Sequence, residues 1–407
     1  MTVPRHTDDK NYYIYNQYGD NTMPPVGPIG IIAHNLSKDF ADSVNYFLRN
    51  RRSIYLARHP ELSQNPGFMR IDYRIPVSTP RFSSGEGKAI ISQSVRGHDL
   101  FIITDVLNYD CYYSRYGQNV STSPDDQFQD LVRLILAVSG QARRINLIMP
   151  YLYEGRQYRR NTRESLDCAA MLKHLFQLGI TNLITFDAHD GRVANAAPTH
   201  SFENLTSSYQ IIEAMFHAIP DLKLDHGSFM VVSPDESGVP KAMYYASMLE
   251  VPLGIFYRKR DYQQTIQGRY PVIGQEFLGE DVRGLDILLV DDMIVTGESM
   301  LRVARDLKAR GARRIFCAVT FAQFTDGLEA VNQAHQAGFI DKVFATNLIY
   351  RRPELQAAPW FVEVNMARFV ALMIDAINHD ASLSKLISPT EKIQKLLDYY
   401  KRRQPES

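Results

Sequence analysis

The stretch ILLVDDMIVTGESM, residues 287–300, places four aliphatic residues directly before two adjacent carboxylates, Asp291 and Asp292. A Thr-Gly turn and a helical pattern follow the two acids. In parallel α/β sheets, ligands bind at the carboxyl ends of the strands. The stretch therefore predicts a buried strand whose two terminal acids face a ligand, followed by a turn and a helix.

The same strand-then-helix order recurs along the chain. The aliphatic runs are GPIGIIAH (27–34), RINLIMPY (144–151), NLITFDAH (182–189), GSFMVVSP (227–234) and DILLVDD (286–292). Amphipathic patterns alternate with them, and Gly179 and Gly311 stand where helices are expected to end. Continuous apolar strands alternating with such helices predict an α/β fold with parallel sheets covered on both faces.

Composition excludes several functional classes. The chain has 407 residues, 45% of them hydrophobic, with 45 Lys+Arg and 45 Asp+Glu, so its formal net charge is zero. No overall positive field exists to hold nucleic acid or an anionic membrane, and no apolar run approaches the length of a membrane span. The polar amino terminus lacks the apolar core of a secretory signal, and the three cysteines form no zinc or disulfide pattern. We expect a cytoplasmic protein that binds neither nucleic acid nor membrane.

The turn after the two acids is suited to an anion. Thr296, Gly297 and Ser299 occupy the turn and first helical residues, where free backbone N–H groups and the helix dipole hold phosphate. The adjacent acids suit the vicinal hydroxyls of a sugar, so a sugar phosphate fits the whole motif. A helix cap at Thr296 and a strand-end turn would be the alternative explanation, but a cap accounts for only one of these groups.

At this point the sequence resembles a known family. VDDMIVTGES (290–299) is similar to the phosphoribosyl diphosphate loop of the type I phosphoribosyltransferase fold. Further segments resemble ribose-phosphate diphosphokinases, also called phosphoribosyl diphosphate synthetases, in family order from about residue 28 to 390. They are RFSSGEGKAIISQSVRGHDLFII (81–103), IMPYLYEGRQYRRNTRES (148–165), TFDAHD (185–190), VVSPDESGVPKA (231–242) and ATNLI (345–349).

The resemblance implies two tandem type I phosphoribosyltransferase-like domains, each a largely parallel sheet flanked by helices. The expected division is an extension (1–27), a nucleotide-binding and oligomer-forming domain (28–200), a ribose 5-phosphate domain (201–390) and a tail (391–407). The implied reaction transfers the diphosphate of MgATP to the C1 hydroxyl of ribose 5-phosphate and releases AMP. A homo-oligomer, either a dimer or a multiple of dimers, is expected.

The resemblance also implies residue roles. Ribose 5-phosphate would be bound by Asp291, Asp292, Thr296, Gly297, Glu298 and Ser299. ATP would contact Arg156, Gln157 and Asn161, together with Phe82, Ser84 and Glu86 from a neighbouring subunit. His189 and Asp235 would hold Mg²⁺, and the catalytic cations would be Arg258, Lys259 and Arg260.

Some positions depart from the family pattern. Val295 replaces a third acid and Glu298 replaces a glycine in the ribose phosphate loop, while Ser84 and Asn161 replace nucleotide-contacting residues. These departures leave two alternatives open: a catalytically weak or inactive regulatory homologue that binds nucleotide and partner subunits, and a phosphoribosyltransferase that consumes the diphosphate product. The intact Asp291-Asp292 pair favours an active enzyme.

Besides the leader up to about Pro28, three segments break the alternation of strands and helices. Residues 58–80 and 108–126 are longer than the family norm, and residues 257–277 are polar and basic with no helical or strand period. Long segments without regular structure in compact domains are usually functional or disordered. We expect the third segment to be a mobile lid that closes on ATP.

Overall fold

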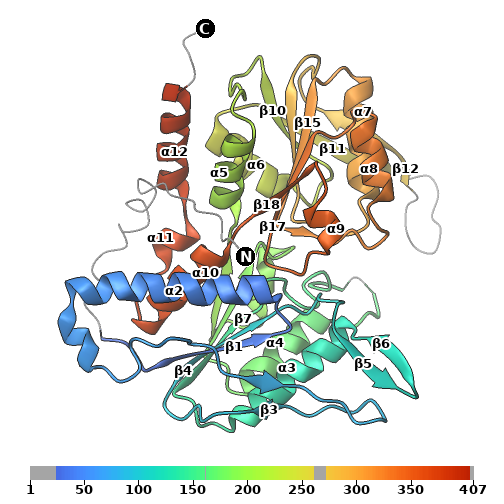
Figure 1. The fold of residues 1–407 in the computed structure, drawn as a ribbon. Coiled ribbons are helices and arrows are strands. Elements are labelled where there is room, and N and C mark those ends of the chain that lie inside the picture. Colours follow the sequence, from blue (N-terminus) through green and yellow to red (C-terminus); the bar gives the residue numbers. More distant parts are fainter. Residues whose placement is uncertain (1–23, 161, 261–271, 404–407) are drawn as a thin grey trace.

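The chain forms two α/β domains stacked against each other in the computed structural model, which describes residues 24–160, 162–260 and 272–403 (Figure 1). Each domain is built on its own sheet, and helices cover both faces of each sheet. This architecture confirms the predicted α/β fold with two tandem domains.

The first sheet has five strands in the order β1-β4-β7-β8-β9, and all four pairings are parallel. The strands are β1 (Ile29–His34), β4 (Asp99–Thr104), β7 (Arg144–Ile148), β8 (Asn182–Phe186) and β9 (Ser201–Leu205). One face packs against α3 (Pro124–Val138) and α4 (Asp167–Gln177), the other against α2 (Lys38–Arg58). Because β9 pairs with β8, the first sheet extends beyond the expected domain boundary at residue 200.

The second sheet has seven strands in the order β12-β11-β10-β13-β15-β17-β18, and only the β11–β12 pairing is antiparallel. The strands are β10 (Phe229–Ser233), β11 (Leu253–Arg260), β12 (Val272–Leu278), β13 (Asp286–Val290), β15 (Arg314–Val319), β17 (Lys342–Thr346) and β18 (Phe361–Val364). Ile287 and Leu289 of β13 face one hydrophobic cluster, and Leu288 and Val290 face another. Burial on both faces explains why this strand is continuously apolar.

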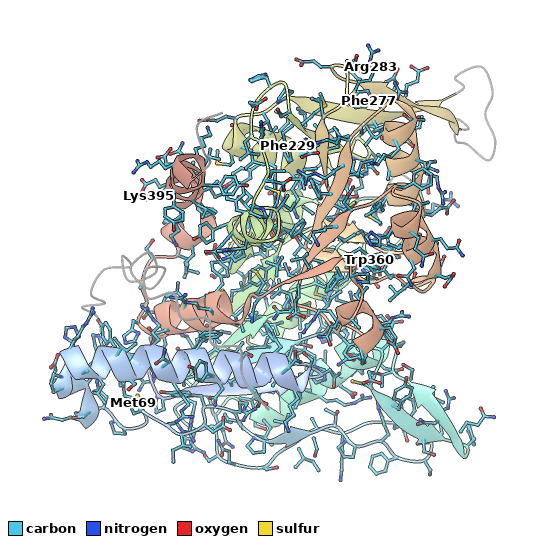
Figure 2. All side chains as sticks on the ribbon, turned by 45° about the horizontal axis from the view of Figure 1, so that its top comes forward. Met69, Phe229, Phe277, Arg283, Trp360 and Lys395 are labelled. Atoms are coloured by element: carbon cyan, nitrogen blue, oxygen red, sulfur yellow. The ribbon has the colours of Figure 1, made fainter. Side chains whose placement is uncertain are left out.

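Two helix layers cover the second sheet. Helices α7 (Glu298–Ala309) and α8 (Glu329–Gln336) pack on one face, and α5 (Ser208–Ala218) and α6 (Val239–Leu249) on the other. Trp360, which is fully buried, lies inside this domain, whereas Arg283 and Lys395 lie at its outer surface (Figure 2). Gly179 and Gly311 follow α4 and α7 with φ of +95°, which confirms the predicted helix ends.

The carboxyl-terminal helices tie the two domains together. α10 (Ala367–Asn378) follows β18 of the second sheet yet packs against α2 of the first domain. Its Asp375 pairs with Arg51 at 2.6 Å and with Arg52 at 3.0 Å. α11 (Ser384–Ile387) and α12 (Thr390–Arg403) follow, and Tyr400 stacks on Phe216 of α5 at a centroid distance of 4.2 Å. One hydrophobic cluster therefore runs through both domains.

The three irregular segments contain short elements. Residues 58–80 include the 3-10 helix η1 (Pro60–Gln64) and β2 (Val77–Ser78), which pairs with β3 (Ile90–Ile91). Residues 108–126 include a hairpin formed by β5 (Tyr112–Arg115) and β6 (Gln118–Ser121). The prediction that residues 257–277 contain no strand is wrong at both ends of the segment. β11 continues to Arg260, and β12 begins at Val272. The middle of that segment, 261–271, lies outside the described residues.

Four short elements complete the described chain: β14 (Met293–Ile294), β16 (Phe321–Ala322), η2 (Gly191–Ala196) and α9 (Pro353–Gln356). Among the residues that the structure describes, no helix combines the length and the apolar character that crossing a membrane requires.

Candidate functional site

Eight of the seventeen site residues predicted from the sequence meet in one cavity between the domains. The cavity holds about 330 Å³ and is lined by Arg156, His189, Asp235, Asp291, Asp292, Thr296, Gly297 and Ser299. These residues lie in the segments that follow β7, β8, β10 and β13 and at the start of α7. The expectation that the carboxyl ends of the strands would hold the site therefore agrees with where the cavity lies.

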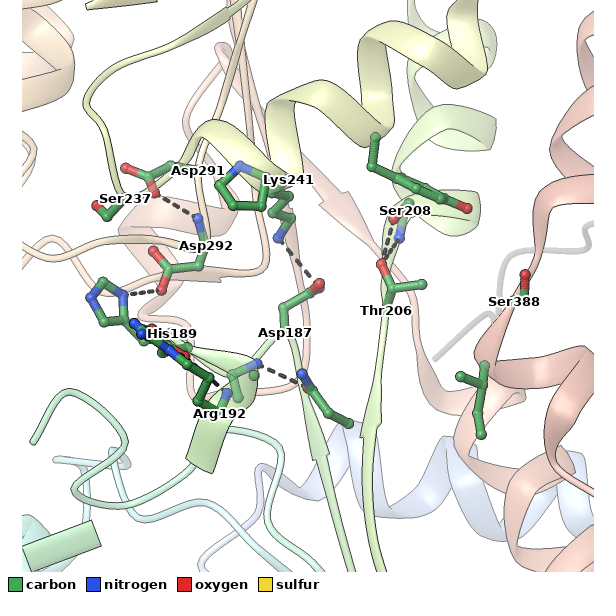
Figure 3. A pocket seen from close by; sticks show the side chains of 18 residues that line it. Asp187, His189, Arg192, Thr206, Ser208, Ser237, Lys241, Asp291, Asp292 and Ser388 are labelled. Atoms are coloured by element: carbon green, nitrogen blue, oxygen red, sulfur yellow. Dashed lines mark hydrogen bonds and ion pairs between the residues drawn. The ribbon is translucent and has the colours of Figure 1, made fainter. Parts of the chain in front are cut away.

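The two acids after β13 are joined to the first domain by a histidine. His189 Nδ1 lies 2.7 Å from Asp292 Oδ2, within hydrogen-bonding distance (Figure 3). The backbone N–H of Asp292 donates to Asp291 Oδ1 at 2.8 Å, and this hydrogen bond holds the carboxylate of Asp291 in place. The pair is thus held in place from both domains.

The pKa values of Asp291, Asp292 and His189 are shifted in different directions. Burial, with the charge of Asp292 added, raises the pKa of Asp291 to about 8. Burial would also raise the pKa of Asp292, but the hydrogen bond and charge of His189 outweigh it and hold that pKa below its ordinary value. The hydrogen bond to Asp292 in turn raises the pKa of His189. The raised pKa shows that ionising Asp291 is unfavourable here, and a cation or hydroxyl donors beside it would stabilise the ionised form.

The turn before α7 has the conformation that an anion loop needs. Gly297, the N-cap of α7, adopts φ +93°, a backbone conformation that other residues rarely take. Thr296 Oγ1 accepts from the N–H of Glu298 at 3.3 Å, while the other N–H groups of the first turn lack helical acceptors. Glu298 is exposed and does not line the cavity, whereas Val295 does.

Asp235 and His189, the two residues expected to hold Mg²⁺, both line this cavity. Asp235 Oδ1 accepts from the N–H groups of Ser237 and Gly238 at 2.9 and 3.2 Å, which fixes its carboxylate at the cavity edge. Within the described ranges, no three His, Cys, Asp or Glu side chains come together as a complete metal cluster. Mg²⁺ commonly takes one or two protein groups and fills its shell with phosphate oxygens and water. The residues fit that mode of binding, and a cation would stabilise the ionised form of Asp291 beside them.

Of the predicted ATP residues in the segment after β7, the structure places Arg156 at the cavity and Gln157 away from it. Arg156 lines it, whereas Gln157 donates from Nε2 to the carbonyl of Ser165 at 2.9 Å and does not line it. Asn161 lies outside the described residues.

The loop expected to reach a neighbouring subunit lies on the surface of the first domain. Phe82, Ser84 and Glu86 are exposed and line neither this cavity nor the one beside it, and Ser84 Oγ donates to Glu86 Oε2 at 2.8 Å. The backbone of Arg258, Lys259 and Arg260 forms the end of β11 and pairs with β12.

A second cavity of about 530 Å³ adjoins the first and shares His189, Ser237, Asp291 and Asp292 with it (Figure 3). Its lining includes Asp187 and Lys241, which the sequence analysis did not single out. Asp187 stands two residues before His189 at the end of β8, and this strand-end position was the signal that could have identified it.

The fold and the paired strand-end acids define a protein of the phosphoribosyltransferase type, and comparison with known proteins agrees. Residues 200–343 match the family described as phosphoribosyl transferase domain, and residues 32–179 match the N-terminal domain of ribose phosphate pyrophosphokinase. A ribose-phosphate pyrophosphokinase from Pasteurella multocida is 30% identical over 338 residues, covering 81% of this chain and 96% of that protein. One from Haemophilus influenzae is also 30% identical over 338 residues, with the same coverage.

The chain therefore belongs to the ribose-phosphate pyrophosphokinase family of enzymes. The solved structure of phosphoribosylpyrophosphate synthetase from Mycobacterium smegmatis shares the fold, with a TM-score of 0.67 and 19% identity. The match covers 87% of this chain and all of that one. The resemblance inferred from the sequence motifs is confirmed.

Proposed function

We propose that this protein transfers the β,γ-diphosphate of MgATP to the C1 hydroxyl of ribose 5-phosphate, giving phosphoribosyl diphosphate and AMP. The observation that carries the proposal is the His189–Asp292 contact, which places a strand-end histidine of one domain against the acid pair of the other. A site shared in this way suits a reaction between two substrates, each presented by its own domain.

Ribose 5-phosphate is assigned to the second domain. Its phosphate would accept hydrogen bonds from the N–H groups around Gly297 and Ser299, where the helix dipole of α7 adds a favourable field. Asp291 and Asp292 would accept hydrogen bonds from the ribose 2- and 3-hydroxyls. Charge on these acids repels an anion, so the phosphate and the hydroxyls occupy separate parts of the cavity.

ATP is assigned to the side of the cavity formed by the first domain. Arg156 lines it there, and Gln157 and Asn161 belong to the same segment. His189 and Asp235 would hold Mg²⁺ together with phosphate oxygens. The bound ion would neutralise charge on the diphosphate as it is transferred.

The chemical step is a substitution at the β-phosphorus. The C1 oxygen forms a bond to that phosphorus, the bond to the α,β-bridging oxygen breaks, and AMP leaves with that oxygen while the hydroxyl proton is released. Such transfers depend on positioning and on charge stabilisation more than on covalent catalysis. We assign charge stabilisation to the cations Arg258, Lys259 and Arg260 at the end of β11, which belong to the segment 257–277.

Phe82, Ser84 and Glu86 would complete the adenine site of a second copy. Phe82 leaves 53% of its surface exposed, and Lys88 lies over its ring at 5.8 Å. An exposed ring is a surface on which a purine can stack. The proposal requires the active species to be at least a homodimer.

The test is to incubate purified protein with MgATP and ribose 5-phosphate and to quantify AMP by chromatography. AMP formation that requires both ribose 5-phosphate and a divalent metal supports the proposal. Folded protein that forms no AMP with several metals and nucleoside triphosphates would instead support the regulatory alternative.

A further inference from the structure

We propose that Asp187, Lys241 and Thr320 form a clamp between the domains that positions His189 against Asp292, so that all three are positioning residues for the reaction. The clamp rests on the proposed function, because the contact it positions is the one assigned to catalysis. None of the three was given a role from the sequence motifs, and each comes from a different element at the interface.

One carboxylate oxygen is the centre of the clamp. Asp187 Oδ2 accepts from Thr320 Oγ1 at 2.6 Å and from Ser207 Oγ at 2.7 Å, and Lys241 Nζ lies 3.3 Å away. Lys241 Nζ also donates to Thr320 Oγ1 at 2.7 Å, so the threonine hydroxyl accepts from the lysine and donates to the acid. Asp187 follows β8 of the first sheet, while Thr320 follows β15 and Lys241 belongs to α6 of the second domain.

These contacts close a ring that contains the catalytic pair. The Thr320 N–H donates to the backbone carbonyl of Asp292 at 3.0 Å, and the Asp292 side chain meets His189. His189 is separated from Asp187 by Ala188 alone, and the Ala188 N–H donates to Asn204 Oδ1 at 3.0 Å. The ring thus runs from Asp187 through His189, Asp292 and Thr320 back to Asp187. A rigid-body shift between the domains cannot change the His189–Asp292 distance without also straining the clamp.

Local backbone geometry indicates that this arrangement is more than ordinary packing. Asp187 has φ +41°, an unfavourable conformation for a residue with a side chain, at the point where the chain turns toward His189. Strained backbone of this kind persists where surrounding contacts hold it, and such sites cluster around functional residues.

The decisive variant is Thr320→Val, which keeps the shape of the side chain and removes the hydroxyl. We expect kcat to fall about 10- to 100-fold, because a misplacement of the order of 1 Å can cost about that much. The KM for ribose 5-phosphate should change by less than about threefold, because the proposed phosphate loop lies wholly in the second domain. Thr320→Ser, which restores the hydroxyl, should recover most of the loss.

Two further variants separate positioning from general destabilisation. Asp187→Asn combined with Thr320→Val should cost little more than either change alone, since both break the same link. Asp39→Asn is the matched control: Arg351 donates to Asp39 Oδ2 at 2.9 Å across the domains, away from the cavity. That variant should keep kcat within about twofold of the unchanged protein.

A measurement without substrates tests the clamp even if the protein forms no AMP. Amide hydrogen exchange followed by mass spectrometry should speed up in peptides covering 187–192 and 318–322 in Thr320→Val, and not in Asp39→Asn. Unchanged exchange there would overturn the clamp. So would normal kcat in Thr320→Val, or a loss carried entirely by the KM for ribose 5-phosphate. Absence of AMP from the unchanged protein would refute the proposed function and leave the exchange result to decide the clamp.

Discussion

His189 Nδ1 and Asp292 Oδ2 lie 2.7 Å apart, although the two residues are 103 positions apart in the chain and follow strands of different sheets. The candidate site therefore exists only where the domains meet. Under the proposed clamp, residues that hold the domains together therefore also set the geometry of this contact.

Replacing Asp292 by Asn should disable the proposed ribose site. The substitution removes the charge that accepts from His189 and, in the proposed complex, from a ribose hydroxyl. We expect kcat/KM for ribose 5-phosphate to fall on the order of 10²–10³-fold, the usual cost of one strong electrostatic contact. Steady-state kinetics measures the loss, and circular dichroism should show an intact fold. Asp306→Asn on the exposed part of α7 is the control and should behave normally. Unchanged kinetics in Asp292→Asn would refute the sugar-binding assignment.

Gly297→Ala should weaken binding of ribose 5-phosphate without a steric clash. An added Cβ would lie 3.6 Å from the ring of Phe324, an ordinary contact, so the penalty is the left-handed backbone at φ +93°. That conformation costs a non-glycine residue about 1–2 kcal/mol. If the loop relieves the strain by moving its N–H groups away from the phosphate, affinity should fall about tenfold. Calorimetric titration with ribose 5-phosphate measures this fall.

The matched control for that experiment is Gly327→Ala. Gly327 has φ +88° with nothing within 4 Å of an added Cβ, and it does not line the cavity. Gly327→Ala should lose about as much stability as Gly297→Ala while keeping its affinity for ribose 5-phosphate. Equal affinity loss in both variants would show that the loop conformation of Gly297 has no special role.

The pKa of Asp291 predicts how stability depends on pH. A carboxyl whose pKa is raised by folding to about 8 holds a proton that the unfolded chain has already released. Stability of the ligand-free protein from this group should therefore fall as pH rises from about 4 to about 8. Above that pH, Asp291→Asn should melt higher than the unchanged protein, by on the order of 2 °C. Thermal denaturation at pH 6 and pH 9 tests this, and a larger advantage at pH 6 would contradict it.

The strand-end cations should be tested one at a time. Arg258→Ala, Lys259→Ala and Arg260→Ala remove the groups assigned to charge stabilisation, and a group that acts only in the transition state lowers kcat and kcat/KM together. We expect at least one variant to lose on the order of 10²-fold or more. Arg283→Ala, whose side chain is exposed and paired with Asp281, should be neutral. Near-normal turnover in all three would exclude a catalytic role for this end of β11.

The sequence predicted those strands and helices whose residue pattern lies within one short segment. The apolar run before Asp291, the turn at Gly297 and the helix after it are all encoded within fourteen residues, and the structure has β13 and α7 there. The pairing of β9 with the first sheet and the packing of α10 on α2 depend on contacts between distant segments. No local pattern signals those contacts, which is why the expected boundary at residue 200 falls inside the first sheet.

The same distinction holds within the site. The strand-end position indicated the acid pair, because ligands bind at the carboxyl ends of parallel strands, whereas His189 and Asp235 were assigned from the family resemblance. Lys241 lies in the segment VVSPDESGVPKA without an assigned role and Thr320 lies outside the quoted segments, so their part in the clamp comes from their distance to Asp187. The strand character of 272–278 was missed because β12 is an edge strand whose polar residues lack a continuous apolar pattern.

The central claim is transfer of an intact diphosphate to the C1 oxygen, and ³¹P nuclear magnetic resonance of the reaction mixture tests it most directly. With MgATP and ribose 5-phosphate, the spectrum should show AMP and a new diphosphate ester appearing in equal amounts, with neither formed when ribose 5-phosphate is omitted. The appearance of ADP with a sugar bisphosphate would mean that only the γ-phosphate moves. That result, or no reaction by folded protein, would contradict the account.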